Sequence, residues 1–269
     1  TSMTGLESVT LAAGTASTST DLTLNVDAGV GVNLTADDTA NDDARIAVTD
    51  AATTTADVLA LGIGGAAAVD FAVVTAASVE RLDIASTTSS ATAITNTIDD
   101  IGASGASAFT TISASADADA DLGITNTYVA AGTQAATNTV SLITSGDGDV
   151  ALGKVNSATS SASLGNVNAI SLTSADAGAR SLEIEHAGNL KSSESSGQAA
   201  GTGVSVSGAG TGEVTVTSTA AILSSLAVDA TDYAGDVTLL TAATTGAINA
   251  VNFDGVDEIV YTGNRATDG

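Results

Sequence analysis

Residues 204–217 run Val-Ser-Val-Ser-Gly-Ala-Gly-Thr-Gly-Glu-Val-Thr-Val-Thr, and this segment contains the pattern that decides the fold. Two runs of alternation, 204–207 and 213–217, place an apolar residue at every second position. Because successive side chains of an extended strand point to opposite faces, each run predicts a strand that buries one face. The glycine-rich residues between the two runs predict a turn.

The same alternation recurs along most of the chain. It is found at 22–26, 45–49, 182–185 and 236–239, and strands are expected roughly every 12 to 15 residues. Helical periodicity is weak, and the best helical candidate is 66–79, which is rich in both Ala and Val. We therefore predict an all-β fold with a stacked-repeat, β-solenoid-like or multi-sandwich, elongated architecture.

The composition favours a thin and regular core. Hydrophobic residues make up 43% of the 269 residues, but only 2% are aromatic, namely three Phe and three Tyr. Aromatic side chains bury the most area per residue, so a thick globular core and a deep pocket are not expected. The hydrophobic content and mean hydropathy of +0.31 exclude an intrinsically disordered chain.

Charge excludes several classes of partner. The chain has 31 acidic and 6 basic residues, a net charge of −25, and a sequence pI near 4.1. Such a surface repels nucleic acids and anionic membranes. The absence of Cys argues against a disulfide scaffold, a zinc site and a thiol nucleophile. No apolar run reaches the ~20 residues that would span a bilayer, so we expect no membrane insertion.

A seven-residue motif recurs at long intervals. Its copies are Gly5-Leu-Glu-Ser-Val-Thr-Leu11, Ser78-Val-Glu-Arg-Leu-Asp-Ile84, Asn166-Val-Asn-Ala-Ile-Ser-Leu172 and Gly255-Val-Asp-Glu-Ile-Val-Tyr261. Their first apolar residues are 73, 88 and 89 positions apart. Self-similarity at a long period indicates stacked units. We predict three repeat units, 1–78, 79–166 and 167–255, with 256–269 as the start of the next unit of a longer chain.

The motif residues have predicted structural roles. We expect the apolar positions to occupy equivalent places in the stack with their side chains inward. The acid or Asn before them is expected to accept hydrogen bonds from free backbone N–H groups of a turn, with ligand contact as the alternative. The apolar positions are Leu6, Val9, Leu11, Val79, Leu82, Ile84, Val167, Ile170, Leu172, Val256, Ile259 and Tyr261.

At this motif the chain resembles bacterial surface-layer proteins of the type I-secreted, repeats-in-toxin-associated kind. Those proteins are acidic, free of Cys and rich in Thr, Ala, Ser, Gly and Asp, with segments of the form G-apolar-E-[ST]-apolar-x-apolar. Residues 5–11 match this form at every position, 78–84 and 255–261 match loosely, and 166–172 lacks the acid. The resemblance implies stacked β-rich domains, type I secretion and calcium-dependent assembly into a lattice. The glycine-rich calcium nonapeptide of such proteins is absent in intact form.

Three groups of acidic residues are candidate calcium ligands. Calcium takes six to eight oxygen ligands from carboxylates, carbonyls and water in flexible loops. The Gly146-Asp-Gly-Asp149 segment offers both carboxylates and accessible carbonyls, and in an extended chain 117, 119 and 121 would share one side. Solvated turns are the alternative interpretation for all three groups. The candidates are Asp37, Asp38, Asp42 and Asp43 in one cluster, Asp117, Asp119 and Asp121 in the next, and Asp147 and Asp149 in the third.

The sequence favours a structural function over an enzymatic one. The only His is His186, and no Ser or Cys pattern accompanies it, so we expect no catalytic residues and no enzyme activity. The first hypothesis is a self-assembling protein of the bacterial cell surface, a layer or filament stabilised by calcium. Its partners are further copies of itself and, through regions outside this chain, cell-surface polysaccharide. The stalk of a large secreted adhesin is the first alternative, and a β-helical carbohydrate-active domain is the second.

Overall fold

The structure is a computed structural model, and it describes twelve segments of the chain. These are residues 6–11, 23–27, 29–35, 45–48, 57–75, 79–102, 109–129, 139–157, 169–184, 203–218, 227–241 and 253–261. They contain twenty β-strands and no helix, so no membrane-spanning helix was found in them. The predicted all-β class is confirmed. The helical candidate 66–79 instead contains a strand, β6, consistent with its Val content.

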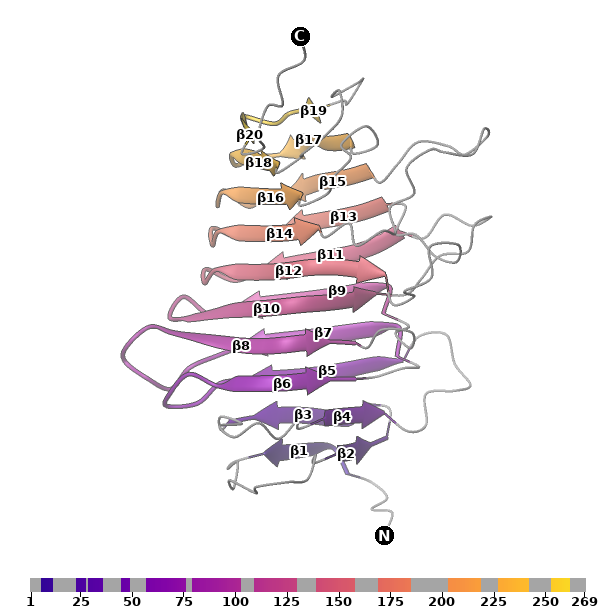
Figure 1. The fold of residues 1–269 in the computed structure, drawn as a ribbon. Coiled ribbons are helices and arrows are strands. Elements are labelled where there is room, and N and C mark those ends of the chain that lie inside the picture. Colours follow the sequence, from indigo (N-terminus) through magenta and orange to yellow (C-terminus); the bar gives the residue numbers. More distant parts are fainter. Residues whose placement is uncertain are drawn as a thin grey trace, which may run out of the picture.

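The strands form two parallel sheets of ten strands each (Figure 1). The odd sheet contains β1 Ser8–Leu11, β3 Gly31–Leu34, β5 Val58–Ile63, β7 Arg81–Ser86, β9 Thr111–Ala116, β11 Thr139–Ser145, β13 Ala169–Ser174, β15 Gly203–Gly208, β17 Ala227–Tyr233 and β19 Phe253–Asp254. The even sheet contains β2 Thr23–Val26, β4 Arg45–Val48, β6 Asp70–Val74, β8 Ile94–Ile101, β10 Ala120–Val129, β12 Val150–Ser157, β14 Arg180–Ile184, β16 Val214–Ser218, β18 Val237–Thr241 and β20 Glu258–Tyr261.

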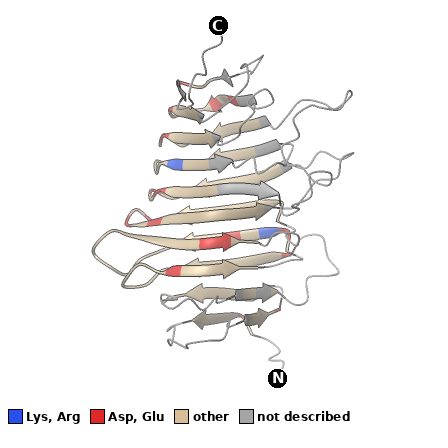
Figure 2. Cartoon of the chain, in the orientation of Figure 1, with Lys and Arg blue, Asp and Glu red and all other residues tan. Residues whose placement is uncertain are grey.

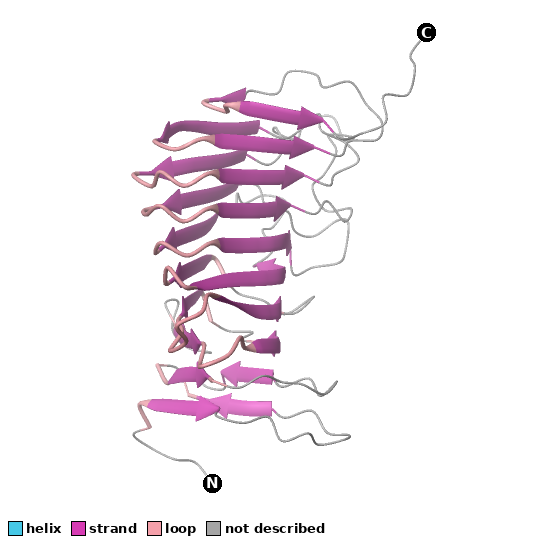
Figure 3. Ribbon diagram, turned by 90° about the vertical axis from the view of Figure 1, so that its left-hand side faces the viewer, coloured by secondary structure: helices cyan, strands magenta, loops and turns pink. Residues whose placement is uncertain are grey.

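Each odd strand and the even strand after it form one rung, and ten rungs stack in chain order (Figures 1 and 3). Every strand pairs in parallel with the strand two places along the chain, as Leu142 does with Ile112 on one side and Leu172 on the other. Neither sheet closes on itself, because no pairing joins its first strand to its last. This is the predicted stacked, β-solenoid-like arrangement.

The core is a narrow layer of aliphatic side chains between the two sheets. Burial alternates along the strands, so that Leu82 and Ile84 in β7 are buried while Arg81 and Asp83 face outward. Phe71 and Phe109 are the aromatic residues among the buried side chains of the described segments. Each fully buried Val, Leu or Ile contributes about 1.5–3 kcal/mol to folding. Repetition of small contributions over ten rungs thus replaces the aromatic bulk of a globular core.

The turns from odd to even strands stack closely against one another. A Cβ on Gly178 would lie 2.2 Å from the carbonyl oxygen of Gly148 in the rung before it. A Cβ on Gly212 would lie 2.1 Å from the carbonyl oxygen of Gly178 in the same way. Real Cβ atoms do not approach backbone that closely, so successive turns require Gly at this position.

The repeated motif is only partly equivalent in the stack. Its first three copies lie in β1, β7 and β13 of the odd sheet, three rungs apart, but the fourth lies in β20 of the even sheet. Register through the intervening strands aligns Val9 with Ile84, and Leu82 with Leu172, a shift of two residues at each step. A two-residue shift keeps the same face inward, which explains why the sequence pattern does not detect it.

The predicted unit boundaries fall near every third rung. Units 1–78 and 79–166 contain β1–β6 and β7–β12, and 167–255 contains β13–β19. Both sheets continue across the first two boundaries. At the first, β5 pairs with β7 and β6 with β8, and at the second, β11 pairs with β13 and β12 with β14. Whether the units fold separately stays a prediction.

Candidate functional site

Acidic residues gather where the odd strands turn into the even strands (Figure 2). In rungs 5 and 6 these turns contain Asp117 and Asp119, and then Asp147 and Asp149. All four are exposed, while Asp121, at the start of β10, is half-buried. Five predicted metal ligands therefore lie along one edge of the stack, on two neighbouring rungs.

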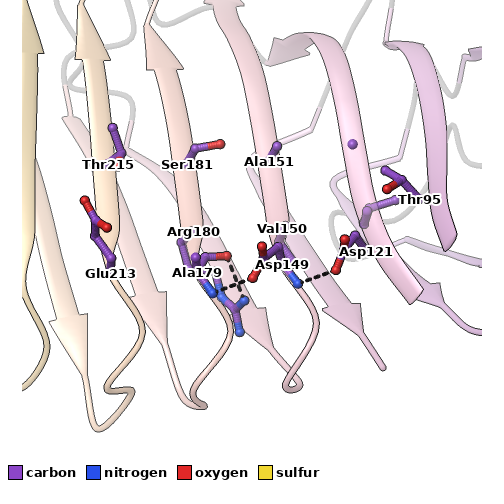
Figure 4. A pocket seen from close by; sticks show the side chains of 12 residues that line it. Thr95, Asp121, Asp149, Val150, Ala151, Ala179, Arg180, Ser181, Glu213 and Thr215 are labelled. Atoms are coloured by element: carbon purple, nitrogen blue, oxygen red, sulfur yellow. Dashed lines mark hydrogen bonds between the residues drawn. The ribbon is translucent and has the colours of Figure 1, made fainter. Parts of the chain in front are cut away.

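Two of these carboxylates link one rung to the next. The backbone N–H of Asp149 donates to Oδ1 of Asp121 at 2.9 Å, and the N–H of Ala179 donates to Oδ1 of Asp149 at 2.9 Å (Figure 4). Two acids of the repeated motif act in the same way. The N–H of Asp57 donates to Glu80 at 3.0 Å, and the N–H of Val237 donates to Asp257 at 2.8 Å. The structural role predicted for the motif acid is thus seen in these two copies.

The first residue of β14, Arg180, places a cation in the interior beside these turns. Its side chain is 2% exposed and occupies an inward position aligned with Val150 in the neighbouring strand. Nη1 donates to the carbonyl oxygens of Gly148 at 2.8 Å and Ala179 at 3.1 Å, and Nη2 donates to that of Gly146 at 2.7 Å. Nε is buried with no hydrogen-bond partner. The guanidinium thus holds the carbonyls of the Gly146–Asp149 turn from inside.

Burial of Arg180 disfavours its charge, and neighbouring groups oppose this effect in part. Burial lowers the pKa of Arg180, whereas Tyr233 and the carboxylates of Asp149, Asp176 and Asp147 raise it. Asp176 also accepts a hydrogen bond from the backbone N–H of Gly146 at 2.8 Å. The acidic turns therefore compensate for part of the cost of burying a cation.

The hydrogen bonds from Arg180 involve atoms of the third candidate calcium group, the turn that contains Asp147 and Asp149. The carbonyl oxygens of Gly146 and Gly148, which the sequence offered as metal ligands, already accept hydrogen bonds from Arg180. These two carbonyls therefore already have a structural role inside the stack. Within the described segments, no group of three or more His, Asp or Glu side chains is close enough to hold a metal. Calcium binding by exposed carboxylates of Asp147 and Asp149 stays a prediction.

The structure describes the second group of candidate calcium ligands, at 117–121, but not the first, at 37–43. Asp117 and Asp119 lie in a turn between β9 and β10, so they do not share the face of a strand with Asp121. The expected extended conformation across these three residues is wrong, because the chain turns at 117–119, and calcium binding by the three acids stays a prediction. The first cluster, Asp37, Asp38, Asp42 and Asp43, lies outside the described residues, as does His186.

A shallow groove of about 350 Å³ crosses the outer face of the even sheet (Figure 4). Its acidic residues are Asp121, Asp149 and Glu213, and its floor contains small residues such as Gly123 and Ala151. The residues that line it include no aromatic side chain. The groove therefore offers no aromatic platform on which a sugar ring could stack.

A second acidic group on the even sheet was not predicted from the sequence. It consists of Asp70 in β6 with Asp99 and Asp100 in β8. Burial raises the pKa of Asp99, the charges of Asp70 and Asp100 raise it further, and a hydrogen bond from Thr125 opposes this. The signal that could have located the group is the pair Asp99-Asp100 inside a β-rich run.

No protein-family model matches the chain, and neither the curated proteins nor the solved structures compared with it provide a match.

Proposed function

We propose that this chain is a non-enzymatic structural protein of the bacterial cell surface that self-assembles into a calcium-stabilised layer or filament. The observation that carries the proposal is the continuous stack of ten rungs in two parallel sheets. At about 4.8 Å per strand, ten rungs extend roughly 45 Å, and each rung repeats the same core. A repetitive scaffold of this kind presents long regular faces to its neighbours.

The charge of the chain supports a role for divalent cations in assembly. Copies with a net charge of −25 repel one another once their surfaces come within a Debye length, about 8 Å at physiological ionic strength. A divalent ion between two carboxylates turns that repulsion into attraction. The residues that would hold calcium between copies are the exposed turn acids Asp117, Asp119, Asp147 and Asp149, together with Asp121 and the acidic cluster at 37–43.

Composition and the surface-layer resemblance support the cell-surface location. Acidic chains without Cys suit secretion, and we propose export by a type I system, with no nucleic acid or membrane as partner. Anchoring to cell-surface polysaccharide is assigned to regions outside this chain. The same rod of stacked rungs also suits the stalk of a large adhesin, which is the second candidate function.

Electron microscopy of the purified chain with millimolar calcium separates these possibilities. We expect ordered sheets or fibres with calcium, dispersal after chelation, and a higher melting temperature with calcium than without it. Sodium chloride at matched ionic strength is the control. Monodisperse rods in calcium would support the adhesin stalk, and sodium acting as well as calcium would show that the acids are only a screened surface.

A further inference from the structure

The first eight strands of the odd sheet, β1 to β15, together have no net charge. Among all residues of the eight odd strands β1 to β15, only Arg81 and Asp83 are charged. These two pair with each other, with Arg81 Nε 2.6 Å from Asp83 Oδ1, so the eight strands have no net charge. The last two odd strands, β17 and β19, add Asp229, Asp232 and Asp254. All ten odd strands therefore have four acidic residues and one basic residue, and the ten even strands have six acidic and three basic, a net charge of −3 for each sheet. The neutral face is the part of the odd sheet formed by β1 to β15.

Hydroxyl groups dominate the central part of this neutral face, which is the outer surface of β9, β11, β13 and β15. Register aligns Thr111, Ser141, Ser171 and Ser205 in one row across the four strands. A second row contains Ser113, Ile143, Thr173 and Ser207. The hydroxyls of Thr173 and Ser207 lie 3.4 Å apart, within hydrogen-bond reach of each other. Because all but one of these side chains are small and polar, the face is flat as well as neutral.

We propose that this neutral face of the odd sheet binds the same face of a second copy of the chain. The inference rests on the proposed function, and it identifies the surface through which assembly begins. Two copies meet the least electrostatic repulsion where their charge is zero. A hydroxyl both donates and accepts hydrogen bonds, so a row of Ser and Thr is complementary to its own symmetry mate.

The size of the face is sufficient for such a contact. Eight strands at about 4.8 Å spacing, each some 17–20 Å long, give a footprint on the order of 700 Å². A standard protein–protein interface buries about 800 Å² on each partner. The contact needs no metal, because it contains no unpaired carboxylate. It therefore differs from the calcium-dependent contacts proposed for the turn acids.

Sedimentation velocity in chelator and moderate salt tests the proposal with two matched double variants. Ser171→Asp/Ser205→Asp places two charges on the neutral face in rungs 7 and 8, where Ser171 aligns with Ser205. Ser181→Asp/Thr215→Asp places two charges on the even sheet in the same rungs, where Ser181 aligns with Thr215. In each pair one side chain is exposed and the other is half-buried. We expect a concentration-dependent dimer for the wild type and the even-sheet variant, and at least a tenfold weaker dimer for the neutral-face variant.

Several outcomes would overturn the proposal. They are a wild type that stays monomeric without calcium, two variants that dimerise equally well or weaken equally, and an even-sheet variant that alone loses the dimer. The chain has no Cys, so single variants Ser205→Cys and Ser181→Cys give a second measurement if a double variant fails to fold. Only the thiol at 205 should become protected from maleimide as protein concentration rises. Loss of calcium-dependent sheets in microscopy with retention of this dimer would contradict the proposed function but not the contact.

Discussion

Rungs 4 and 7 each bind the backbone of neighbouring turns through a buried polar side chain, but the two residues differ. Asn96 in β8 and Arg180 in β14 occupy the same inward position, as the register through Leu122 and Val150 shows. Both bind turn backbone from inside the stack. Asn96 accepts from the N–H of Val69 at 2.9 Å and donates to the hydroxyl of Ser86 at 2.9 Å and the carbonyl of Thr87 at 3.3 Å.

The two positions differ in the charge of the turns beside them. The turn at 87–93, which leads into β8, contains no acidic residue, and a neutral amide is buried there. The turns next to Arg180 contain Asp147, Asp149 and Asp176, and a cation is buried there. In these two rungs the buried polar residue matches the charge of the turns beside it: a neutral amide lies beside a neutral turn, and a cation lies beside acidic turns.

Among the variants considered, replacement of Arg180 is expected to lower the free energy of unfolding the most. Arg180→Met removes three hydrogen bonds, including those to the buried carbonyl of Gly148 and the half-buried carbonyl of Gly146, so we expect a loss of about 3 kcal/mol or more in the free energy of unfolding. Arg81→Met is the control, because the Arg81 side chain is 44% exposed and its surface ion pair contributes under ~1 kcal/mol. Urea unfolding measures both, and equal losses would contradict the internal role of Arg180.

Replacement of Asn96 should cost less, because the group removed is neutral. Asn96→Leu leaves the buried N–H of Val69 without its acceptor and removes a donor from the half-buried carbonyl of Thr87, and we expect a loss of about 2 kcal/mol in the free energy of unfolding. Amide hydrogen exchange should show the loss at Val69 first. Asn33→Leu changes an exposed Asn of the odd sheet and should leave exchange at Val69 as it is. If Asn96→Leu lost more free energy of unfolding than Arg180→Met, the neutral amide would stabilise its rung more than the buried cation does, contrary to our expectation.

The carboxylates that link the rungs should stabilise the fold mainly through their hydrogen bonds, and less through their negative charge. Asp149→Ala removes the acceptor for the N–H of Ala179 and should cost about 1 kcal/mol. Asp149→Asn keeps an acceptor and should stay within about 0.5 kcal/mol of the wild type. Thermal unfolding of the two variants side by side measures this difference. If both lose the same stability, the charge beside Arg180 matters and the hydrogen bond does not.

The smallest effect is expected at the acidic group of the even sheet, and it depends on pH. Because the pKa of Asp99 is raised in the folded protein, the folded state holds this proton more tightly than the unfolded chain does. Stability therefore falls as pH rises from the ordinary carboxyl pKa through the raised value. Asp99→Asn should melt slightly above the wild type at neutral pH, and the difference should shrink below about pH 4.

Asp236→Asn, in an exposed turn, is the control for the general loss of one negative charge. It should raise the melting temperature at neutral pH less than Asp99→Asn does. A lower melting temperature for Asp99→Asn at neutral pH would show that the hydrogen bond from Thr125 outweighs burial and the neighbouring charges.

The sequence predicts the strands well because each strand depends on local alternation. The runs at 204–207 and 213–217 became β15 and β16 in neighbouring positions of the two sheets. Register was not predictable, because a shift of two residues keeps Leu82 and Leu172 buried alike. The role of Arg180 was also missed, since its partners are backbone carbonyls 32 and 34 residues earlier in the chain. The acids of the turns were found from composition, but their rung-to-rung hydrogen bonds depend on register.

The parallel stack has a mechanical consequence. Strand-to-strand hydrogen bonds run along the direction in which the rungs are stacked, so tension between the first and last rungs pulls on these bonds lengthwise. Rungs then separate one after another, and each step breaks the bonds of a single rung. The side-chain bonds from Asp121 and Asp149 cross two of these gaps at the turn edge, where they share the load with the backbone. Such a stack yields in small steps under tension, one rung at a time.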